Sequence, residues 1–442
     1  MEKLVVKGGK KLNGSISVSG SKNMALKALV ASCLTRDEMV IKNVPLISDL
    51  SVMADIIREL GGVVRIRDHV VSIRLKKIKR TKISLDKAAA IRTSLMFLAP
   101  LLVREGKAII PNPGGCRIGA RPIDRIIKGI EKMGVKVKYQ SKDGFFHLEI
   151  PKKLKPVRYR FEKNTHTGTE TMIILSVLVK GKTVLDNAAS EPEVDDLIEL
   201  LNLMGADVKR TSLRTIVING VEKLNGTEFS IPPDRSEIVT FAVAAVITKG
   251  NILIKDINSR RLEEFINIFR KVGGGVEVRR NKIRFFYKQE LKPMDITTTF
   301  YPGFMTDWQG PWVVLATQAN GQSNVHETVY ENRFGYVEEL SKMGAEIKLF
   351  NPMVKNPQSF YNFNLKDNRP EYKHAAGIKG PVRLHNAVIN ISDLRAGATL
   401  VLASLTALGE SVIFGVEHLD RGYERFDKRL RALGANIKRR EE

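Results

Sequence analysis

The stretch Met133-Gly134-Val135-Lys136-Val137-Lys138-Tyr139 joins the end of an amphipathic helix to an alternating strand. A glycine just past the last apolar residue is a common helix stop, because glycine readily takes the left-handed conformation found there. The same helix-ending glycine recurs at Leu60-Gly61-Gly62, Met204-Gly205-Ala206, Val272-Gly273-Gly274, Met343-Gly344-Ala345 and Leu433-Gly434-Ala435. Successive first glycines are 73, 71, 68, 71 and 90 residues apart. The sequence therefore predicts six copies of one unit of about 70 residues, with an insertion in the last interval.

Each unit is predicted to begin with a helix that is apolar on nearly all sides and therefore buried. These helices are expected at Lys22–Leu34, Ile91–Val103, Gly168–Val179, Ile238–Thr248, Trp312–Ala319 and Gly397–Leu408. A short strand, an amphipathic helix and two alternating strands follow in each unit. Asp49, Asp124 and Glu193 stand near three starts of the amphipathic helices, where an acid suits the helix dipole. Asp143-Gly144 predicts a hairpin turn between strands 135–139 and 145–150.

Six such units indicate two α/β domains of three repeats each, pseudo-threefold, with helices inside and sheets outside. Ile231-Pro232-Pro233-Asp234 breaks the pattern between the third and fourth units. We therefore expect one domain at 21–231, with repeats 1–3, and another formed by 1–20 and 232–442, with repeats 4–6. The N-terminal strand Leu4-Val5-Val6 is expected to close the second domain. The insertion, roughly Phe350 to Leu384, is predicted to be a surface excursion whose aromatic residues pack on themselves, or alternatively cover a partner.

Composition excludes several classes of protein. The 442 residues are 43% hydrophobic, their apolar runs are far shorter than a bilayer span, and two cysteines make no disulfide framework. We expect a cytoplasmic protein without a membrane partner. The net charge of +24 favours anionic ligands, but the basic residues are spread along the chain without a zinc-ligand spacing or an RNA-binding aromatic motif. A nucleic-acid partner is therefore disfavoured, and the oligomeric state is left open.

Polar clusters are expected at the N-termini of the buried helices, where unpaired N–H groups and the dipole attract anions. They are Ser19-Gly20-Ser21-Lys22-Asn23, Ile91-Arg92-Thr93, Lys163-Asn164-Thr165-His166-Thr167-Gly168, Asp234-Arg235-Ser236, Thr306-Asp307 and Asp393-Leu394-Arg395-Ala396. Ordinary helix caps are the alternative, and it is favoured for Ser21 and Thr306. Lys22 and Arg395 oppose the dipole, which indicates a functional role. No metal-ligand spacing, Walker loop or dinucleotide motif is present, so neither a metal nor a cofactor is expected.

The stretch Pro111-Asn112-Pro113-Gly114-Gly115-Cys116-Arg117-Ile118-Gly119-Ala120-Arg121-Pro122 is predicted to be a long loop. It places a cysteine among arginines, whose charge favours the thiolate. The second cysteine, Cys33, lies in a buried apolar helix and is expected to be inert. An incidental loop cysteine is the alternative to a reactive one.

These residues resemble the enolpyruvyl transferase family, in its branch that acts on a sugar nucleotide. The resemblance covers nearly the whole chain outside the insertion. It rests on Ser19–Asn23, Pro113–Pro122, Glu191-Pro192-Glu193, Glu331-Asn332-Arg333-Phe334, Asp393–Ala396 and Asp420-Arg421-Gly422-Tyr423-Glu424-Arg425. It implies two inside-out α/β domains. It also implies transfer of the enolpyruvyl group of phosphoenolpyruvate to the 3′-hydroxyl of UDP-N-acetylglucosamine, with release of phosphate, in peptidoglycan synthesis.

By the same resemblance, Cys116 would be the acid and Asp307 the base, with Lys22 and Arg395 also catalytic. The loop that carries Cys116 would close when the sugar nucleotide binds. Phosphoenolpyruvate would be held by Lys22, Asn23, Arg121, Arg395 and Arg421. The UDP-sugar would be held by Asn23, Arg92, Arg121, Pro122, Ile123, Asp124, Arg125, Lys163, Thr165, Gly168, Asp307 and Val329.

The sequence departs from the family pattern in places. Ile126 stands where many members have a histidine, and the segment 163–168 is one residue longer than usual. Two alternative functions are considered. The shikimate-pathway enolpyruvyl transferase, which makes the same transfer to shikimate 3-phosphate, is disfavoured because its usual Gly-Asn-Ala-Gly-Thr segment is absent. A basic binding paralogue that has lost catalysis is disfavoured because the proposed catalytic residues occur together.

Overall fold

The computed structural model describes residues 2–115 and 118–441 and divides them into two compact units. Unit 1 comprises residues 2–19, 118–121 and 233–441, and unit 2 comprises residues 20–115 and 122–232. Each unit has its own cluster of buried apolar side chains. Within the described residues, no helix has the length and apolar character needed to cross a membrane.

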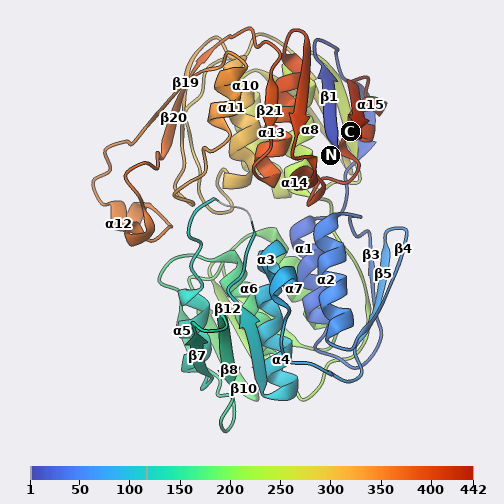
Figure 1. Ribbon diagram of the computed structural model, residues 1–442, viewed down its shortest axis with the longest axis vertical. Coiled ribbons are helices and arrows are strands. Elements are labelled where there is room, and N and C mark those ends of the chain that lie inside the picture. Colours follow the sequence, from blue (N-terminus) through green and yellow to red (C-terminus); the bar gives the residue numbers. More distant parts are fainter. Residues whose placement is uncertain (1, 116–117, 442) are drawn as a thin grey trace. The chain divides into compact units, whose positions relative to one another are not determined.

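In unit 2 the first helix of each repeat is buried, and the sheets lie around these helices (Figure 1). The buried helices are α1 (Lys22–Ser32), α4 (Leu98–Glu105) and α6 (His166–Ser176), with a 3-10 turn, η1 (Arg92–Phe97), leading into α4. The other helices are α2 (Ser48–Glu59), α3 (Leu85–Ala90), α5 (Asp124–Lys132) and α7 (Pro192–Leu203). In the described part of this unit the sheets have the strand orders β13-β3-β5-β4, β6-β8-β7 and β11-β12-β10-β9. Their strands are β3 (Met39–Lys42), β4 (Val63–Arg67), β5 (Val70–Arg74), β6 (Lys107–Pro111), β7 (Lys136–Gln140), β8 (Phe145–Glu149), β9 (Arg158–Arg160), β10 (Gly181–Asp186), β11 (Asp207–Ser212), β12 (Thr215–Gly220) and β13 (Glu228–Ser230).

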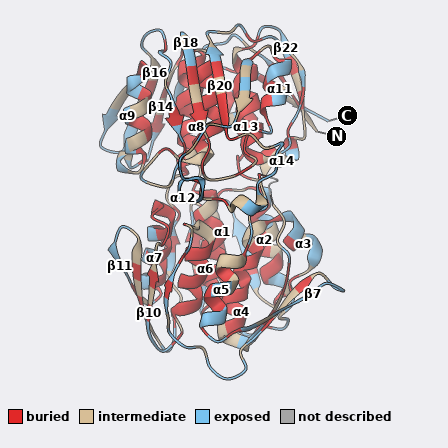
Figure 2. Cartoon of the chain, turned by 90° about the vertical axis from the view of Figure 1, so that its left-hand side faces the viewer, coloured by how far each residue is buried: buried red, intermediate tan, exposed pale blue. Residues whose placement is uncertain are grey.

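Unit 1 repeats this plan. Its buried helices α8 (Arg235–Ile247), α10 (Gln309–Thr317) and α13 (Leu394–Thr406) pack against one another, and Figure 2 shows α8 and α13 lined with buried residues. The other helical segments are η2 (Ser259–Leu262), α9 (Glu263–Lys271), η3 (Thr306–Trp308), α11 (Val337–Lys342), α12 (Pro357–Phe360), η4 (Leu365–Asp367), α14 (Val416–Asp420) and α15 (Phe426–Ala432). The described strands form sheets ordered β21-β22-β1-β23, β15-β16-β14-β2 and β17-β18-β20-β19.

The strands of unit 1 are β1 (Lys3–Lys7), β2 (Asn13–Ser17), β14 (Asn251–Lys255), β15 (Gly274–Arg279), β16 (Lys282–Tyr287), β17 (Ile296–Thr297), β18 (Gly321–His326), β19 (Glu346–Phe350), β20 (Ala375–Gly380), β21 (Val388–Asn390), β22 (Glu410–Phe414) and β23 (Asn436–Arg440). The N-terminal strand β1 lies between β22 and β23 and is antiparallel to both. The first and last strands of the chain are therefore held in one sheet.

The helix-ending glycines confirm the repeat. Their φ angles lie between +87° and +104° in every copy, at Gly61, Gly134, Gly205, Gly273, Gly344 and Gly434. Each of these glycine N–H groups donates to a carbonyl three residues back, and the next residue commonly donates to one five back, as Val135 does to Ile130. This pair of bonds satisfies carbonyls that the helix end would otherwise leave unpaired. The predicted hairpin at Asp143-Gly144 is also confirmed, with β7 and β8 antiparallel around it.

The predicted helix starts are wrong by a few residues in several repeats. Helices α6, α8 and α13 begin before their apolar runs because Thr165, Asp234 and Asp393 cap them with side-chain oxygens. The helix predicted at Ile91–Val103 is divided into η1 and α4. Apolar periodicity marks what is buried, whereas the capping residue determines where the helix begins.

The insertion is shorter than predicted, because residues 375–380 form β20 and pair antiparallel with both β18 and β19. The excursion is confined to residues 351–374 and contains the short segments α12 and η4. Tyr361 and Phe363 are buried and stacked on each other at 4.8 Å between ring centroids, and the His374 ring packs against both at 5.1 and 4.9 Å. Burial lowers the pKa of His374 to about 4. The excursion is therefore packed on itself, as the favoured alternative predicted.

Gly134 provides a test of the repeat-ending turn. Replacing Gly134 with Ala is expected to lower the unfolding free energy by about 1 kcal/mol, because φ is +97° although the nearest atom to an added Cβ is 3.6 Å away. Gly335→Ala is the control, since an added Cβ there meets nothing within 4 Å and its φ is not in the left-handed region. Urea unfolding measures both. Equal stability of the two variants would contradict the assigned turn.

Candidate active site

Asp307 lies in η3, at the entry to the buried helix α10 of unit 1. The residue before it, Thr306, was expected to be an ordinary helix cap, and this is wrong. Its hydroxyl donates to Oε2 of Glu327 at 2.9 Å, and the 3-10 turn has no side-chain cap. Glu327 is fully buried and also accepts the N–H groups of Val329 and Tyr330, at 2.8 and 3.1 Å. Glu327 thus fixes the turn before Asp307 and the loop that carries Val329.

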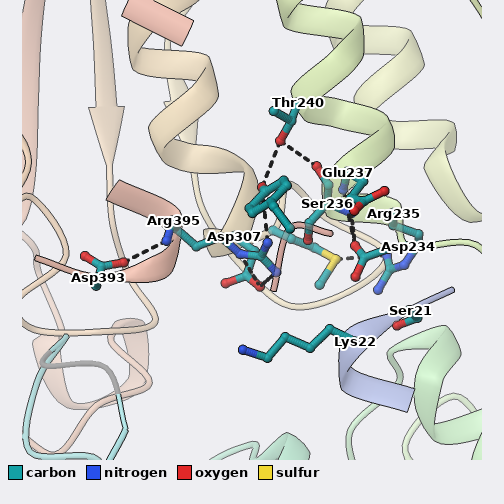
Figure 3. A network of polar contacts seen from close by, with 12 residues as sticks. Ser21, Lys22, Asp234, Arg235, Ser236, Glu237, Thr240, Asp307, Asp393 and Arg395 are labelled. Carbon is teal, nitrogen blue, oxygen red and sulfur yellow. Dashed lines mark hydrogen bonds and ion pairs between the residues drawn. The ribbon is translucent and has the colours of Figure 1, made fainter. Parts of the chain in front are cut away.

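Two guanidinium groups share the Asp307 carboxylate. Arg395 donates to Oδ2 from Nε and Nη2 at 3.2 and 2.9 Å, and Arg333 donates to Oδ1 from Nη2 at 3.0 Å. Figure 3 shows Arg395 meeting Asp307. Burial alone would raise the pKa of Asp307, but the charges of Arg395 and Arg333 outweigh it and hold that pKa well below its usual range. Asp307 is therefore a carboxylate at neutral pH.

Arg395 is held from behind. It is the second residue of α13, and Asp393 caps that helix by accepting the Arg395 N–H at 2.9 Å. Its Nη1 donates to the hydroxyl of the buried Tyr423 at 3.2 Å, and that hydroxyl is 2.9 Å from the Thr240 hydroxyl. Asp393, Tyr423 and Thr240 therefore orient the guanidinium toward Asp307.

Arg421 and Arg121 complete the predicted cations of unit 1. Arg421 follows α14 directly and is half-buried. Arg121 has a left-handed backbone, φ +47°, and its guanidinium lies 5.6 Å from the centre of the Tyr330 ring. The predicted acid Cys116 and its neighbour Arg117 lie outside the described residues.

In unit 2, Lys22 opens α1 and its ammonium is 2.6 Å from Oδ2 of Asp49, near the start of α2. Both side chains are buried, at 10% and 5% exposure. Asp49 was predicted to interact with its own helix dipole, and the structure adds this ion pair. The pair explains how a cation is accommodated at a helix N-terminus. The predicted ligand Asn23 is the next residue of α1 and is half-buried.

Other predicted ligands of the UDP-sugar cluster around α5 and α6 of unit 2. Ile123 precedes α5, Asp124 and Arg125 open it, and Arg125 Nη1 donates to the Asn164 carbonyl at 3.3 Å. Burial, reinforced by Arg125, lowers the pKa of Lys163. The Thr165 hydroxyl accepts the Gly168 N–H at 3.1 Å, so it also caps α6. Pro122 comes just before Ile123 in the chain, and Arg92 is the first residue of η1.

Sequence reasoning missed several ionic residues of these sites. Arg333 stood in a matching motif but was given no role, and Glu327 was not singled out. In unit 2, the fully buried Glu170 pairs with Lys27 at 2.8 Å and with His166 at 3.0 Å. Burial lowers the pKa of His166, but Glu170 raises it by more. Charged residues inside otherwise apolar helices were the available signal. Ile126 is buried in the core, which suits an apolar residue at that position.

No group of three or more potential metal ligands occurs among residues 2–115 and 118–441. The charged side chains that the structure brings together at these positions are carboxylates, guanidiniums and ammonium groups. These groups bind anions and stabilise developing negative charge.

Comparison with known proteins places this geometry in context. A family model described as EPSP synthase (3-phosphoshikimate 1-carboxyvinyltransferase) matches residues 6–430. The chain is 40% identical over 441 residues to UDP-N-acetylglucosamine 1-carboxyvinyltransferase of Magnetococcus marinus, and the match covers 99% of each chain. It is 38% identical over 444 residues to the protein of that name from Acidobacterium capsulatum, covering 99% of this chain and 96% of the relative.

Solved structures agree on the fold. The enolpyruvyl transferase NikO from Streptomyces tendae superimposes with a TM-score of 0.86 at 23% identity, covering 99% of this chain and 98% of NikO. EPSP synthase from Acinetobacter baumannii gives a TM-score of 0.74 at 18% identity over the full length of both chains. The predicted α/β fold with buried helices and outer sheets is confirmed.

Asp307→Asn tests the charge cluster. It leaves two buried guanidiniums without their shared carboxylate, so the unfolding free energy at pH 7 is expected to fall by about 2 kcal/mol or more. The folded pKa of Asp307 is depressed. The stabilisation that the ionised Asp307 gives the folded state is therefore complete above the unfolded pKa of about 3.9. It is lost as the pH falls from there through the folded pKa.

Urea unfolding at pH 7, 4 and 3 should show that the difference in unfolding free energy between wild type and Asp307→Asn becomes smaller toward pH 3. Asp295→Asn is the control, since Asp295 accepts the Asn324 N–H at 2.7 Å and pairs with no guanidinium in the described part of the chain. A gap that stays constant with pH would contradict the arrangement.

Proposed function

The chain belongs to the enolpyruvyl transferase family, and we propose that it transfers the enolpyruvyl group of phosphoenolpyruvate to the 3′-hydroxyl of UDP-N-acetylglucosamine, releasing phosphate. The observation that carries the proposal is 36–40% identity over 99% of the chain to several proteins named for that reaction. A role in peptidoglycan synthesis, a cytoplasmic location and small-molecule partners are part of the proposal.

The reaction has three chemical requirements. Addition forms a bond between the sugar oxygen and C2 of phosphoenolpyruvate while C3 takes a proton. Elimination then breaks the C2–O bond to phosphate and returns a proton from C3. A base must accept the hydroxyl proton, an acid must supply the C3 proton, and cations must hold the carboxylate and phosphate. On the family resemblance we assign Asp307 as the base and Cys116 as the acid. Lys22, Asn23, Arg121, Arg395 and Arg421 are assigned to phosphoenolpyruvate.

The charge cluster gives this assignment an order of events. A carboxylate bound by two guanidiniums is a weak base, since its pKa is low. Phosphoenolpyruvate would compete with Asp307 for Arg395, because it brings a carboxylate and a phosphate. Each guanidinium bond that Asp307 loses raises its pKa. In this proposal the anionic substrate both occupies Arg395 and makes Asp307 more basic.

The UDP-sugar requires groups for a diphosphate and for neutral sugar and base. Cations among the proposed ligands are suited to the diphosphate, and the pKa of Lys163 is lowered by burial and, in addition, by the positive charge of Arg125 nearby. The proposed set is Asn23, Arg92, Arg121, Pro122, Ile123, Asp124, Arg125, Lys163, Thr165, Gly168, Asp307 and Val329.

The activity can be tested directly. Purified protein is expected to release phosphate from phosphoenolpyruvate only when UDP-N-acetylglucosamine is present, and Asp307→Asn should reduce kcat by at least about 100-fold, since it removes the proposed base. Asp295→Asn should retain activity. Colorimetric phosphate release measures all three proteins. Folded wild type that releases none would exclude the transferase proposal, and activity with shikimate 3-phosphate alone would select the shikimate-pathway reaction.

The two cysteines should differ in reactivity. Fosfomycin, an epoxide that alkylates thiolates, is expected to add mass at Cys116 and not at Cys33. Burial raises the pKa of Cys33 to about 12, and its side chain is fully buried. Peptide mass spectrometry after incubation at neutral pH locates the adduct, with Cys116→Ser as the control. Modification of Cys33, or of neither residue, would contradict a reactive thiol at Cys116.

A further inference from the structure

The motif Glu331-Asn332-Arg333-Phe334 helped to place the chain in its family, but no role was assigned to it. Its residues sit in unit 1, between the loop fixed by Glu327 and the helix α11. Arg333 reaches Asp307, as described above. Glu331 and Asn332, just before Arg333, instead contact residues 118–120, which follow Cys116 in the chain.

Residues 118–121 contact this motif and Tyr330, the residue just before it. Oε1 of Glu331 accepts the Ala120 N–H at 2.5 Å, and the Asn332 N–H donates to the Ile118 carbonyl at 3.3 Å. The Arg121 guanidinium lies over the Tyr330 ring. Two hydrogen bonds to the backbone of this segment, one with a side chain and one with a main chain, and one cation–π contact therefore hold residues 118–121.

Gly119 lies directly against the Glu331 carboxylate. A Cβ added at Gly119 would be 2.4 Å from Cδ and Oε2 of Glu331, and Gly119 has φ +140°. Both its backbone conformation and the space around it exclude a side chain. The close approach is what allows the Ala120 N–H to reach the carboxylate.

Glu331 is costly to bury. It is 2% exposed, and burial raises its pKa, with Asp367 of η4 adding repulsion. The Ala120 N–H is the largest influence that favours the ionised form. Removing a carboxylate from water costs free energy, and here one N–H of the loop is its main compensation. Glu331 is therefore expected to contribute little to stability, and its contact with the loop needs another explanation.

We propose that Glu331 is a positioning residue that clamps residues 118–121 and so sets the position of Arg121 relative to Asp307. The role rests on the proposed function, in which Arg121 holds phosphoenolpyruvate and Asp307 is the base. Glu331 acts through the Ala120 N–H, and Arg333 two residues later holds Asp307. One short motif thus fixes the base and the described end of the acid-bearing loop in the same unit.

Hydrogen exchange and kinetics test the clamp. In Glu331→Ala, amide exchange of a peptide covering 118–122 is expected to accelerate by at least about 10-fold, because Ala120 loses its acceptor. If wild type turns over, kcat should fall by at least about 10-fold, with a smaller change in KM for UDP-N-acetylglucosamine. Glu331→Gln should recover much of the exchange protection and of kcat, since its amide oxygen can accept the same N–H.

Glu339→Ala is the matched control. Glu339 is half-buried in unit 1 and accepts the Asn390 N–H at 3.2 Å, and no hydrogen bond or ion pair within the described residues joins it to residues 118–121. It should lose stability without faster exchange at 118–122. Gly119→Ala, which keeps the carboxylate but displaces the loop, should behave like Glu331→Ala, and it decides the matter if Glu331→Ala does not fold.

Unchanged exchange at 118–122 in the folded variants, or an equal acceleration in Glu339→Ala, would overturn the clamp. The exchange comparison needs no turnover. Its result therefore stands even if wild type releases no phosphate, and the failure of the clamp and the failure of the proposed reaction are distinguishable.

Discussion

Complete burial of the central helices is the constraint on which the rest of each unit depends. Helices such as α8 and α13 have nearly every residue buried, so water cannot satisfy their first N–H groups. Asp234 and Asp393 meet this need as caps in unit 1, and Ser21 and Thr165 do so in unit 2. Polar and charged residues are therefore gathered at one end of otherwise apolar helices. Because each buried helix needs a capping side chain at its first turn, Lys22 and Arg395, which lie in that turn, are beside a cap.

Charge balance then determines what these ends can bind. Arg333 and Arg395 are almost wholly buried and share the single carboxylate of Asp307. Glu327 is close enough to Arg333 to influence it, but burial raises the pKa of Glu327 and weakens the compensation it offers. Asp393 also acts on Arg333, and Asp234 on Arg395, so the cluster is closer to charge balance than the Asp307 pairing alone suggests. The two guanidiniums still favour an anion that competes with Asp307 for their N–H groups. The net charge of +24 acts in the same direction at longer range.

The sequence was most informative where one residue determines local structure. The helix-ending glycines have one conformational role, so their spacing predicted the repeat and their φ angles agree in every copy. Thr306 shows the limit, because a threonine before a helix is usually a cap, and here a glutamate 21 residues away takes its hydroxyl. Lys22 with Asp49, and Arg333 with Asp307, likewise join different elements of one repeat, and Arg395 with Asp307 joins two repeats. Periodicity reports burial, but the partner of a buried charge depends on tertiary packing.

The segment from Glu327 to Arg333 shows why such partners matter for catalysis. Glu327 holds the turn before Asp307, Arg333 depresses the pKa of Asp307, and Glu331 takes the Ala120 N–H. None of these side chains needs to touch a substrate to affect the reaction. In the proposed reaction, Asp307 as the base would be protected from premature protonation and would gain basicity when an anion competes for its guanidiniums. The depressed pKa of Asp307 is a consequence of its pairing with Arg333 and Arg395. On this proposal, the anionic substrate relieves the depression by taking over part of that pairing.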